Sequence, residues 1–251
     1  MRTIGIIAEY NPFHSGHRHH IQAVRQAFGA DCAVVCAMSG NWVQRGEAAL
    51  ADKWTRTALA LRQGVDLVVE LPTPWAVSSA EPFARGGVGL LTATGVVDTL
   101  SFGSEAGALP PLQAAADCLA SPAWQEVLRQ GLAEGLSFPV ARQQAATALL
   151  GDAARCLQGP NNNLGVEYLL ALRALESPLR PHTVPRQGAG HDEGPSPSSP
   201  MPLPATCGRG SWPGTLPPSP HTSPPQRRPP CGRIPPRWTL GVGGCWPGCG
   251  P

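Results

Sequence analysis

The sequence predicts an α/β protein built on a doubly wound, Rossmann-like parallel sheet. Short β-like apolar runs alternate with amphipathic helical segments along the first part of the chain. The loop after the first run carries a proline that stops the strand and a glycine that lets the next helix begin. The 251 residues are 42% hydrophobic, which suffices for a sizeable core.

The first elements predict a βαβ unit: a strand at 3–8, a helix at 16–28 and a strand at 32–38. The strands are short and rich in Ile and Val, while the helix shows the 3.6-residue apolar period. The alternation then continues in the same sense. It predicts a helix at 52–63, a strand at 66–70, a helix at 79–91 and a strand at 99–102.

A helical insert at about 110–158 follows the fourth strand. Residues 112–150 read as helices, with Pro122 and Pro139 near first-turn positions, where proline is tolerated. Beyond the insert we expect an amphipathic helix at 164–175. A short extended piece at 182–184 could add a last strand to the sheet.

The chain divides near Glu193 into a domain at 1–193 and a tail at 194–251. The tail has no Asp, Glu or Lys, and nearly half of it is Pro and Gly. We expect it to be disordered, since this composition leaves no run able to bury a core face. A frameshift product is one interpretation. A proline-rich ligand or RNA-binding tail is the other, and Arg227, Arg228, Arg233 and Arg237 are a modest argument for it.

Composition and charge narrow the class of protein. The net charge of +2 gives no bulk signal for nucleic-acid binding. The N-terminus does not resemble a signal peptide and no run approaches the ~20 apolar residues of a membrane span, so we expect a cytoplasmic protein without membrane contact. Eight cysteines form no CxxC pair, which argues against a metal site.

The loop at 9–17 carries the chemistry. Pro12 ends the strand, Gly16 allows the helix to start close to a ligand, and His14 and His17 lie three residues apart at that start. Free backbone N–H groups and the helix dipole favour phosphate there, and imidazoles add donors. The alternative is a pair of surface histidines at a helix cap.

Basic residues after the second strand are further candidates. Lys53 is the only lysine, Arg56 lies three residues further on, and Arg45 precedes them in the loop. They could contact phosphate or an RNA backbone. On charge pattern alone, a solvated helix face with Glu47 and Asp52 as ion partners is equally consistent.

The sequence HSGH at 14–17 resembles the HIGH signature of the nucleotidyltransferase superfamily, which includes adenylyltransferases and class I aminoacyl-tRNA synthetases. More narrowly, six blocks that appear in family order resemble the tRNA(Met) cytidine acetate ligase family. They cover residues 1 to about 192 and read IIAEYNPFH from 6, SGNWVQRGE from 39, DLVVELP from 66, FGSE from 102, PNN from 160 and RQGAGHD from 186.

The resemblance implies that ATP, with Mg²⁺, activates acetate as acetyl-adenylate. The acetyl group then passes to N4 of the wobble cytidine of elongator tRNA(Met). It implies catalytic roles for His14, His17 and Lys53, and phosphate or tRNA contacts for Arg45 and Arg56. The ATP-binding residues it implies are Ile7, Ala8, Glu9, Tyr10, Asn11, Pro12, Phe13, His14, Gly16, His17, His20, Gly103, Asn161, Asn162 and Arg186.

Several of these residues also have plain structural interpretations. Gly103 could be a turn glycine, Asn161 and Asn162 could be helix N-caps, and Arg186 could be a surface residue. Members of the family continue into a second phosphate-binding motif and a C-terminal domain, which we do not recognise after residue 192. A generic small-molecule adenylyltransferase and a catalytically impaired nucleotide-binding remnant therefore stay open, as does the oligomeric state.

Overall fold

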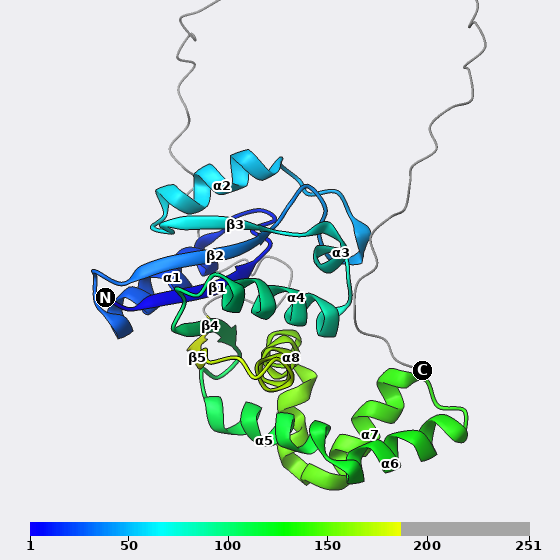
Figure 1. Ribbon diagram of the computed structural model, residues 1–251. Helices are drawn as coiled ribbons and strands as arrows, with labels where there is room; N and C mark the ends of the chain where they lie inside the picture. Colours follow the sequence, from blue (N-terminus) through cyan, green and yellow to red (C-terminus); the bar gives the residue numbers. More distant parts are fainter. Residues whose placement is uncertain (187–251) are drawn as a thin grey trace, which may run out of the picture. The chain divides into compact units, whose positions relative to one another are not determined.

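The computed structural model describes residues 1–186. The expectations for the tail at 194–251, and for the block that follows Arg186, lie outside the described residues. The described chain forms one five-stranded sheet with helices packed on it (Figure 1).

The sheet is parallel throughout and has the strand order β3-β2-β1-β4-β5. This order confirms the doubly wound architecture, since the chain runs outward from β1 to one edge, returns, and runs to the other edge. The bounds are β1 Thr3–Ala8, β2 Ala33–Ser39, β3 Leu67–Leu71, β4 Thr99–Ser104 and β5 Arg180–Pro185.

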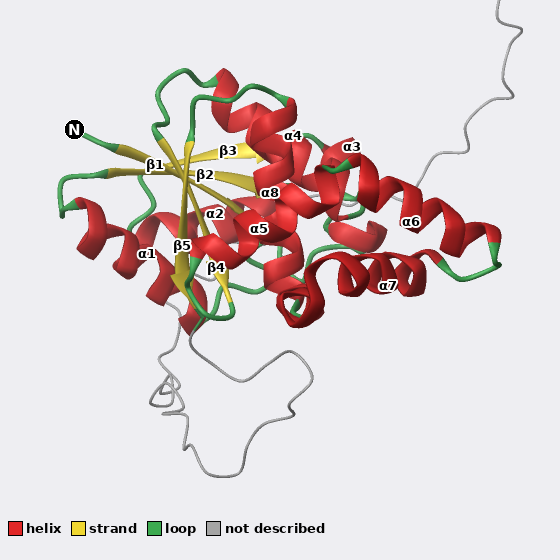
Figure 2. Cartoon of the chain, turned by 90° about the horizontal axis from the view of Figure 1, so that it is seen from below, coloured by secondary structure: helices red, strands yellow, loops and turns green. Residues whose placement is uncertain are grey.

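Helices cover both faces of the sheet, as Figure 2 shows from below. On one face, α1 (Ser15–Phe28) and α2 (Lys53–Arg62) enclose a hydrophobic cluster that includes Ile4, Ile21 and Val34. On the other face, α4 (Ala80–Ala93) and α8 (Pro160–Ala174) enclose a larger cluster. Alternate residues of β1 serve the two cores, because successive strand side chains point to opposite faces.

The remaining helices are mostly where the sequence predicts them. The expected helices within 112–150 are present, although the first begins slightly earlier. Two short elements, α3 and η1, were not predicted because three or four residues carry no readable period. The bounds are η1 Gln44–Gly46, α3 Thr73–Ala76, α5 Leu109–Ala120, α6 Pro122–Ala133, α7 Phe138–Leu150 and η2 Gly151–Gln158.

Helix α4 approaches the centre of the sheet closely at Gly87. A Cβ atom added there would lie 2.7 Å from the side chain of Ile7 on β1, so only glycine fits without displacement. This close contact packs the end of β1 directly against α4.

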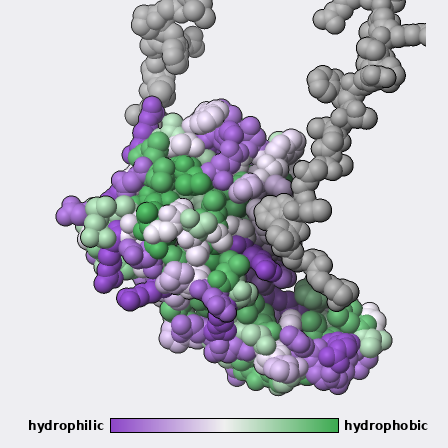
Figure 3. Space-filling view, viewed as in Figure 1, coloured by the Kyte–Doolittle hydropathy of each residue, from purple (hydrophilic) through white to green (hydrophobic). Residues whose placement is uncertain are grey.

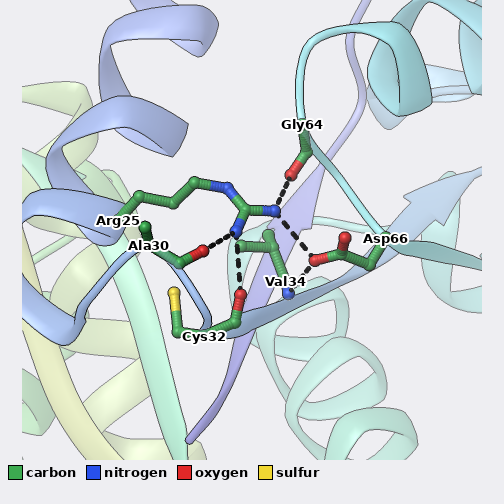
Figure 4. Close-up of polar contacts among 6 residues, drawn as sticks. All are labelled: Arg25, Ala30, Cys32, Val34, Gly64 and Asp66. Carbon is green, nitrogen blue, oxygen red and sulfur yellow. Dashed lines mark hydrogen bonds and ion pairs between the residues drawn. The ribbon is translucent and has the colours of Figure 1, made fainter.

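The far end of α1 is held by Arg25 (Figure 4). Its guanidinium donates to the carbonyls of Ala30 (2.8 Å), Cys32 (2.9 Å) and Gly64 (2.8 Å), and pairs with Asp66 at 3.0 Å. These contacts join α1 to the starts of β2 and β3. They leave the opposite end of α1, with His14 and His17, at the carboxyl edge of the sheet.

The face shown in Figure 3 mixes hydrophobic and hydrophilic residues on both the sheet half and the α5–α7 half. Isolated exposed hydrophobic side chains are usual on folded proteins. Among residues 1–186, no helix is long and apolar enough to cross a bilayer.

Candidate nucleotide site

A pocket of about 370 Å³ opens beyond the carboxyl ends of β1 and β4. These are the strands between which the chain reverses its direction across the sheet, and this is where doubly wound sheets usually bind ligands. The pocket is lined by Ile6, Ile7, Ala8, Glu9, Tyr10, Asn11, Pro12, His14, Gly16, His17, His19, His20, Gln44, Phe83, Phe102, Gly103, Asn161, Leu164, Tyr168, Val184, Pro185 and Arg186.

The start of α1 is closed by a reciprocal cap made by two histidines. The backbone N–H of Gly16 donates to Nδ1 of His14 (3.1 Å), and the N–H of His14 donates to Nδ1 of His17 (3.2 Å). A ring nitrogen that accepts a hydrogen bond cannot carry the proton. Each ring therefore bears its proton on Nε2, the nitrogen farther from the backbone.

The two imidazoles stack, with centroids 3.6 Å apart and planes 24° from parallel. Burial lowers the pKa of His17 to about 3, with smaller contributions from His14, His20 and Arg186. His17 is thus neutral near pH 7, and its ring donor is Nε2–H. It supplies a preoriented dipole at the helix start without a full charge.

A second helix start faces the pocket, but a carboxylate of the chain already occupies it. Glu105 accepts from the backbone N–H of Asn161 (3.1 Å) and of Asn162 (2.8 Å), in the first turn of α8. Gly159 precedes this turn, and a side chain there would collide with the Glu105 carboxylate. An external anion is therefore directed to the start of α1 and away from α8.

The rest of the pocket offers a mixed surface. Phe102, Leu164 and Tyr168 form an apolar wall, whereas Glu9, which follows β1, and Arg186, which follows β5, are its charged groups. A Cβ atom on Gly103 would lie 3.3 Å from Cγ of Arg186, so a larger residue would crowd that arginine. Burial raises the pKa of Glu9, although its carboxylate accepts from the N–H of Gln44 at 2.7 Å.

The structure brings most of the predicted ATP-binding residues together. Phe13 and Asn162 do not line the pocket. The ring of Phe13 packs on Tyr10 at 4.9 Å, and Oδ1 of Asn162 accepts from the N–H of Glu105 at 3.1 Å. Those that line it are Ile7, Ala8, Glu9, Tyr10, Asn11, Pro12, His14, Gly16, His17, His20, Gly103, Asn161 and Arg186.

Neither asparagine is a helix N-cap, because α8 begins at Pro160 and Gly159 holds the cap position. Nonlocal contacts with Glu105 satisfy this end of the helix. The predicted start at 164 was wrong for that reason.

Arg56 occupies a position that the sequence did not predict. Only 1% of its surface is exposed, so Arg56 does not lie on the solvated helix face that the charge pattern allowed, and its expected contact with phosphate or RNA stays a prediction. Its guanidinium donates to the carbonyls of Glu9, Gly40 and Ala51. Burial lowers the pKa of Arg56, and the facing carbonyls compensate the charge by accepting hydrogen bonds. Arg56 thus ties the loop after β1 to the loop after β2.

Lys53 and Arg45 do not line the pocket. Nζ of Lys53 pairs with Glu70 at 2.6 Å, a partner that the sequence did not suggest. Arg45 lies exposed in η1 with a positive φ of 66°. Asp52 caps α2 through the N–H groups of Trp54 and Thr55, both at 2.9 Å.

Sequence reasoning missed several residues of the pocket wall. Phe83, Leu164 and Tyr168 read as ordinary helix-core positions, and only the sheet topology brings them to the site. His19 and Gln44 adjoin predicted residues and could have been found by extending the motifs. Within residues 1–186, no group of three or more His, Cys, Asp or Glu side chains is arranged to hold a metal ion.

Comparison with known proteins places this geometry in a family. The family model described as HIGH Nucleotidyl Transferase matches residues 1–201. The tRNA(Met) cytidine acetate ligase of Syntrophotalea carbinolica is 52% identical over 79% of this chain, and that of Caldanaerobacter subterraneus is 46% identical over 75%. The chain spans 48% of the length of each of these relatives.

Two solved structures are also similar to this chain. Thermotoga maritima TmcAL bound with alpha-thio ATP has a TM-score of 0.71 and 40% identity, covering 75% of this chain and 47% of its own. The apo form of that protein gives a TM-score of 0.72 with 39% identity, covering 77% and 47%.

Proposed function

Since the chain belongs to the HIGH nucleotidyl transferase family, we propose that its pocket binds ATP with the phosphates at the start of α1. The observation that carries this is the histidine cap, which places the ring proton of His14 and of His17 on Nε2. Backbone N–H groups, the helix dipole and neutral imidazole donors act together there. Glu105 closes the competing site on α8.

In this arrangement the nucleoside lies against the apolar wall of Phe102 and Tyr168. Gly103 leaves room for it at the end of β4, and Arg186 stands beside that glycine. A solved relative that is 40% identical binds an ATP analogue, which supports the same ligand class here.

We further propose acetate activation, followed by transfer to tRNA. A carboxylate oxygen of acetate attacks the α-phosphorus of ATP, a P–O bond forms, and pyrophosphate leaves. The N4 amine of the wobble cytidine of elongator tRNA(Met) then attacks the acetyl carbonyl, and AMP leaves. Donors at the start of α1 stabilise the charge that builds on the phosphates in the first step. The curated names of the relatives support this substrate pair.

Mg²⁺ fits the proposal as a phosphate-bound ion. It usually binds through substrate phosphates and one or two carboxylates, and it keeps several waters. Glu9 is the carboxylate of the pocket wall. It would be the side chain that approaches such an ion.

The test is ATP binding by calorimetry together with ATP–pyrophosphate exchange in the presence of acetate. His14→Ala and His17→Ala should each lower exchange by about 10²-fold or more, as expected for the loss of a preorganised donor to developing phosphate charge. Arg129→Ala, on the exposed face of α6, is the matched surface control and should behave as wild type.

Equal exchange in wild type and both histidine variants would show that the cap is only structural. Incubation with ATP, labelled acetate and tRNA(Met) then separates the alternatives. Labelled cytidine supports the proposed reaction, pyrophosphate release with another acid supports a different adenylyltransferase, and ATP binding without release supports a nucleotide-binding module.

A further inference from the structure

A partly buried line of hydrogen bonds leads from the pocket wall to the edge strand β5. Nε2 of His20 lies 2.8 Å from Oγ of Ser101 on β4, and the same oxygen lies 3.2 Å from Nδ1 of His182 on β5. Ser101 is fully buried, and His20 lines the pocket one turn after His17. The proposed chemistry uses neither Ser101 nor His182.

The register of the sheet explains this alignment. Ser101 lies opposite Ile6 on β1 and opposite His182 on β5, so the three side chains point to the same face. Ile6 belongs to the core beneath α1 and α2. Helix α1 covers this face and places His20 over Ser101, and the ring of its Phe28 meets His182 edge-on at 4.8 Å.

A single hydroxyl proton couples the two rings. Ser101 can donate to only one of its two imidazole partners, and it must accept from the other. If it donates to Nε2 of His20, the ring proton of His20 lies on Nδ1 and that of His182 on Nδ1. If it donates to His182, both rings carry their proton on Nε2. The hydroxyl therefore couples the two tautomers, because both rings carry their proton on Nδ1 or both carry it on Nε2.

The surroundings keep both rings neutral. Burial lowers the pKa of His20 to about 4, with His182 and His19 adding to the effect, and burial also lowers the pKa of His182. A neutral ring offers one donor and one acceptor. The tautomer of His20 therefore decides whether its Nδ1 is a donor or an acceptor.

We propose that Ser101 and His182 are positioning residues, which fix the orientation and tautomer of His20 in the wall of the nucleotide pocket. Through His20 they set which hydrogen bond this wall offers to a bound nucleotide. The inference rests on the proposed binding of ATP, and it adds a role for two residues that touch no nucleotide themselves.

The first test needs no nucleotide. In the ¹⁵N-labelled ligand-free chain, long-range ¹H–¹⁵N spectra of the imidazoles should show a single tautomer for His20, identified by its loss in His20→Asn. Ser101→Ala should convert it to a mixture, whereas Ser101→Thr, which keeps the hydroxyl, should restore one tautomer. A His20 spectrum that is the same in wild type and Ser101→Ala overturns the proposal.

The second test measures the role. Ser101→Ala should weaken ATP binding about 3- to 10-fold, which is the range for one lost net hydrogen bond. It should raise KM for ATP and leave kcat of the exchange reaction unchanged. Ser177→Ala is the matched control. It removes the hydrogen bond between the hydroxyls of Ser177 and Thr92, which is 2.7 Å long and involves no residue of the pocket wall. Both variants lose a partly buried hydrogen bond of a serine hydroxyl, so a general loss of stability would affect them alike.

Equal ATP affinity in wild type and Ser101→Ala, or an equal loss in Ser177→Ala, overturns the positioning role alone. Failure of the wild-type chain to bind ATP overturns the proposed function as well. The spectra of the ligand-free chain still distinguish the two cases, because they report the hydrogen-bonded line directly.

Discussion

At the scale of single residues, the two cap histidines combine roles that a sequence motif does not separate. His17 satisfies a backbone donor through Nδ1 and keeps its proton on Nε2. Its neighbours His14, His20 and Arg186 all oppose a positive charge on the ring. The same contacts that start the helix thus keep the ring in its neutral state.

This neutrality predicts a pH dependence of stability. The pKa of His17 falls from 6.5 to about 3 on folding, so between these values the unfolded chain binds a proton that the folded chain excludes. The free energy of unfolding contributed by His17 is therefore complete above pH 6.5 and declines below it. Between pH 7.5 and pH 5, wild type should lose about 1–2 kcal/mol more than His17→Gln in urea unfolding.

The His17→Gln comparison isolates this residue, since the glutamine amide oxygen can replace Nδ1 in the cap. Burial raises the pKa of Glu9 and of Glu167, and these groups act in the opposite direction in both proteins. Identical slopes for wild type and variant would mean that His17 is protonated in the folded chain.

The position of a residue could be predicted when its contacts lie close to it in the sequence. The loop at 9–17 holds its information in consecutive residues, and the sequence located it. Arg56 could not be placed, because an arginine is seldom buried and its acceptors lie on three separate segments. Ser101 and His182 meet only through strand register, 81 residues apart in the chain.

At the scale of elements, α8 shows how a helix can be capped from a distance. Its own cap residue, Gly159, has no side chain, and Glu105 from the end of β4 accepts the N–H groups instead. The carboxylate also receives the side-chain amide of Asn161 at 3.1 Å. This contact fixes the start of α8 against the sheet and shapes one wall of the pocket.

Replacing this carboxylate should therefore weaken the fold. We expect Glu105→Ala to lower the free energy of unfolding by about 1–2 kcal/mol, the range for removal of a helix N-cap. The measurement is urea unfolding followed by circular dichroism. Glu126→Ala, which removes an exposed partner of Arg129 within α6, is the control and should leave stability unchanged. Equal effects of the two substitutions would contradict the capping role.

The type of an element could be predicted where its apolar period ran over many residues. The boundaries of an element could not be predicted where tertiary contacts determine them. The strands and the long helices followed their periods. The start of α8 was misplaced by four residues, because Pro160 to Asn163 reads as a loop unless Glu105 is known to lie nearby. The extra turn α3 is held by packing rather than by a period of its own.

At the scale of the whole molecule, the described fold has its own two cores. The residues of both clusters lie between Ile4 and Leu179, and the last pocket residue is Arg186. Nothing in the composition of the tail predicts a third core.

We therefore expect a chain that ends at residue 193 to melt at the same temperature as the full chain and to bind ATP equally well. Differential scanning calorimetry and calorimetric titration measure these two quantities. Limited proteolysis of the full chain should accumulate a fragment that ends near residue 193. A melting temperature several degrees lower in the shortened chain would mean that the tail packs on the domain.

The position of β5 at the edge of the sheet has a consequence for the protein during its synthesis. Strands β1, β2 and β3 can pair as soon as they emerge from the ribosome, and β4 then adds on the other side of β1. Strand β5, with His182 and the adjoining Arg186, emerges last of all the described elements. The nascent chain can thus bury most of its core while its ligand pocket still lacks one wall, and the site is completed only by the final strand.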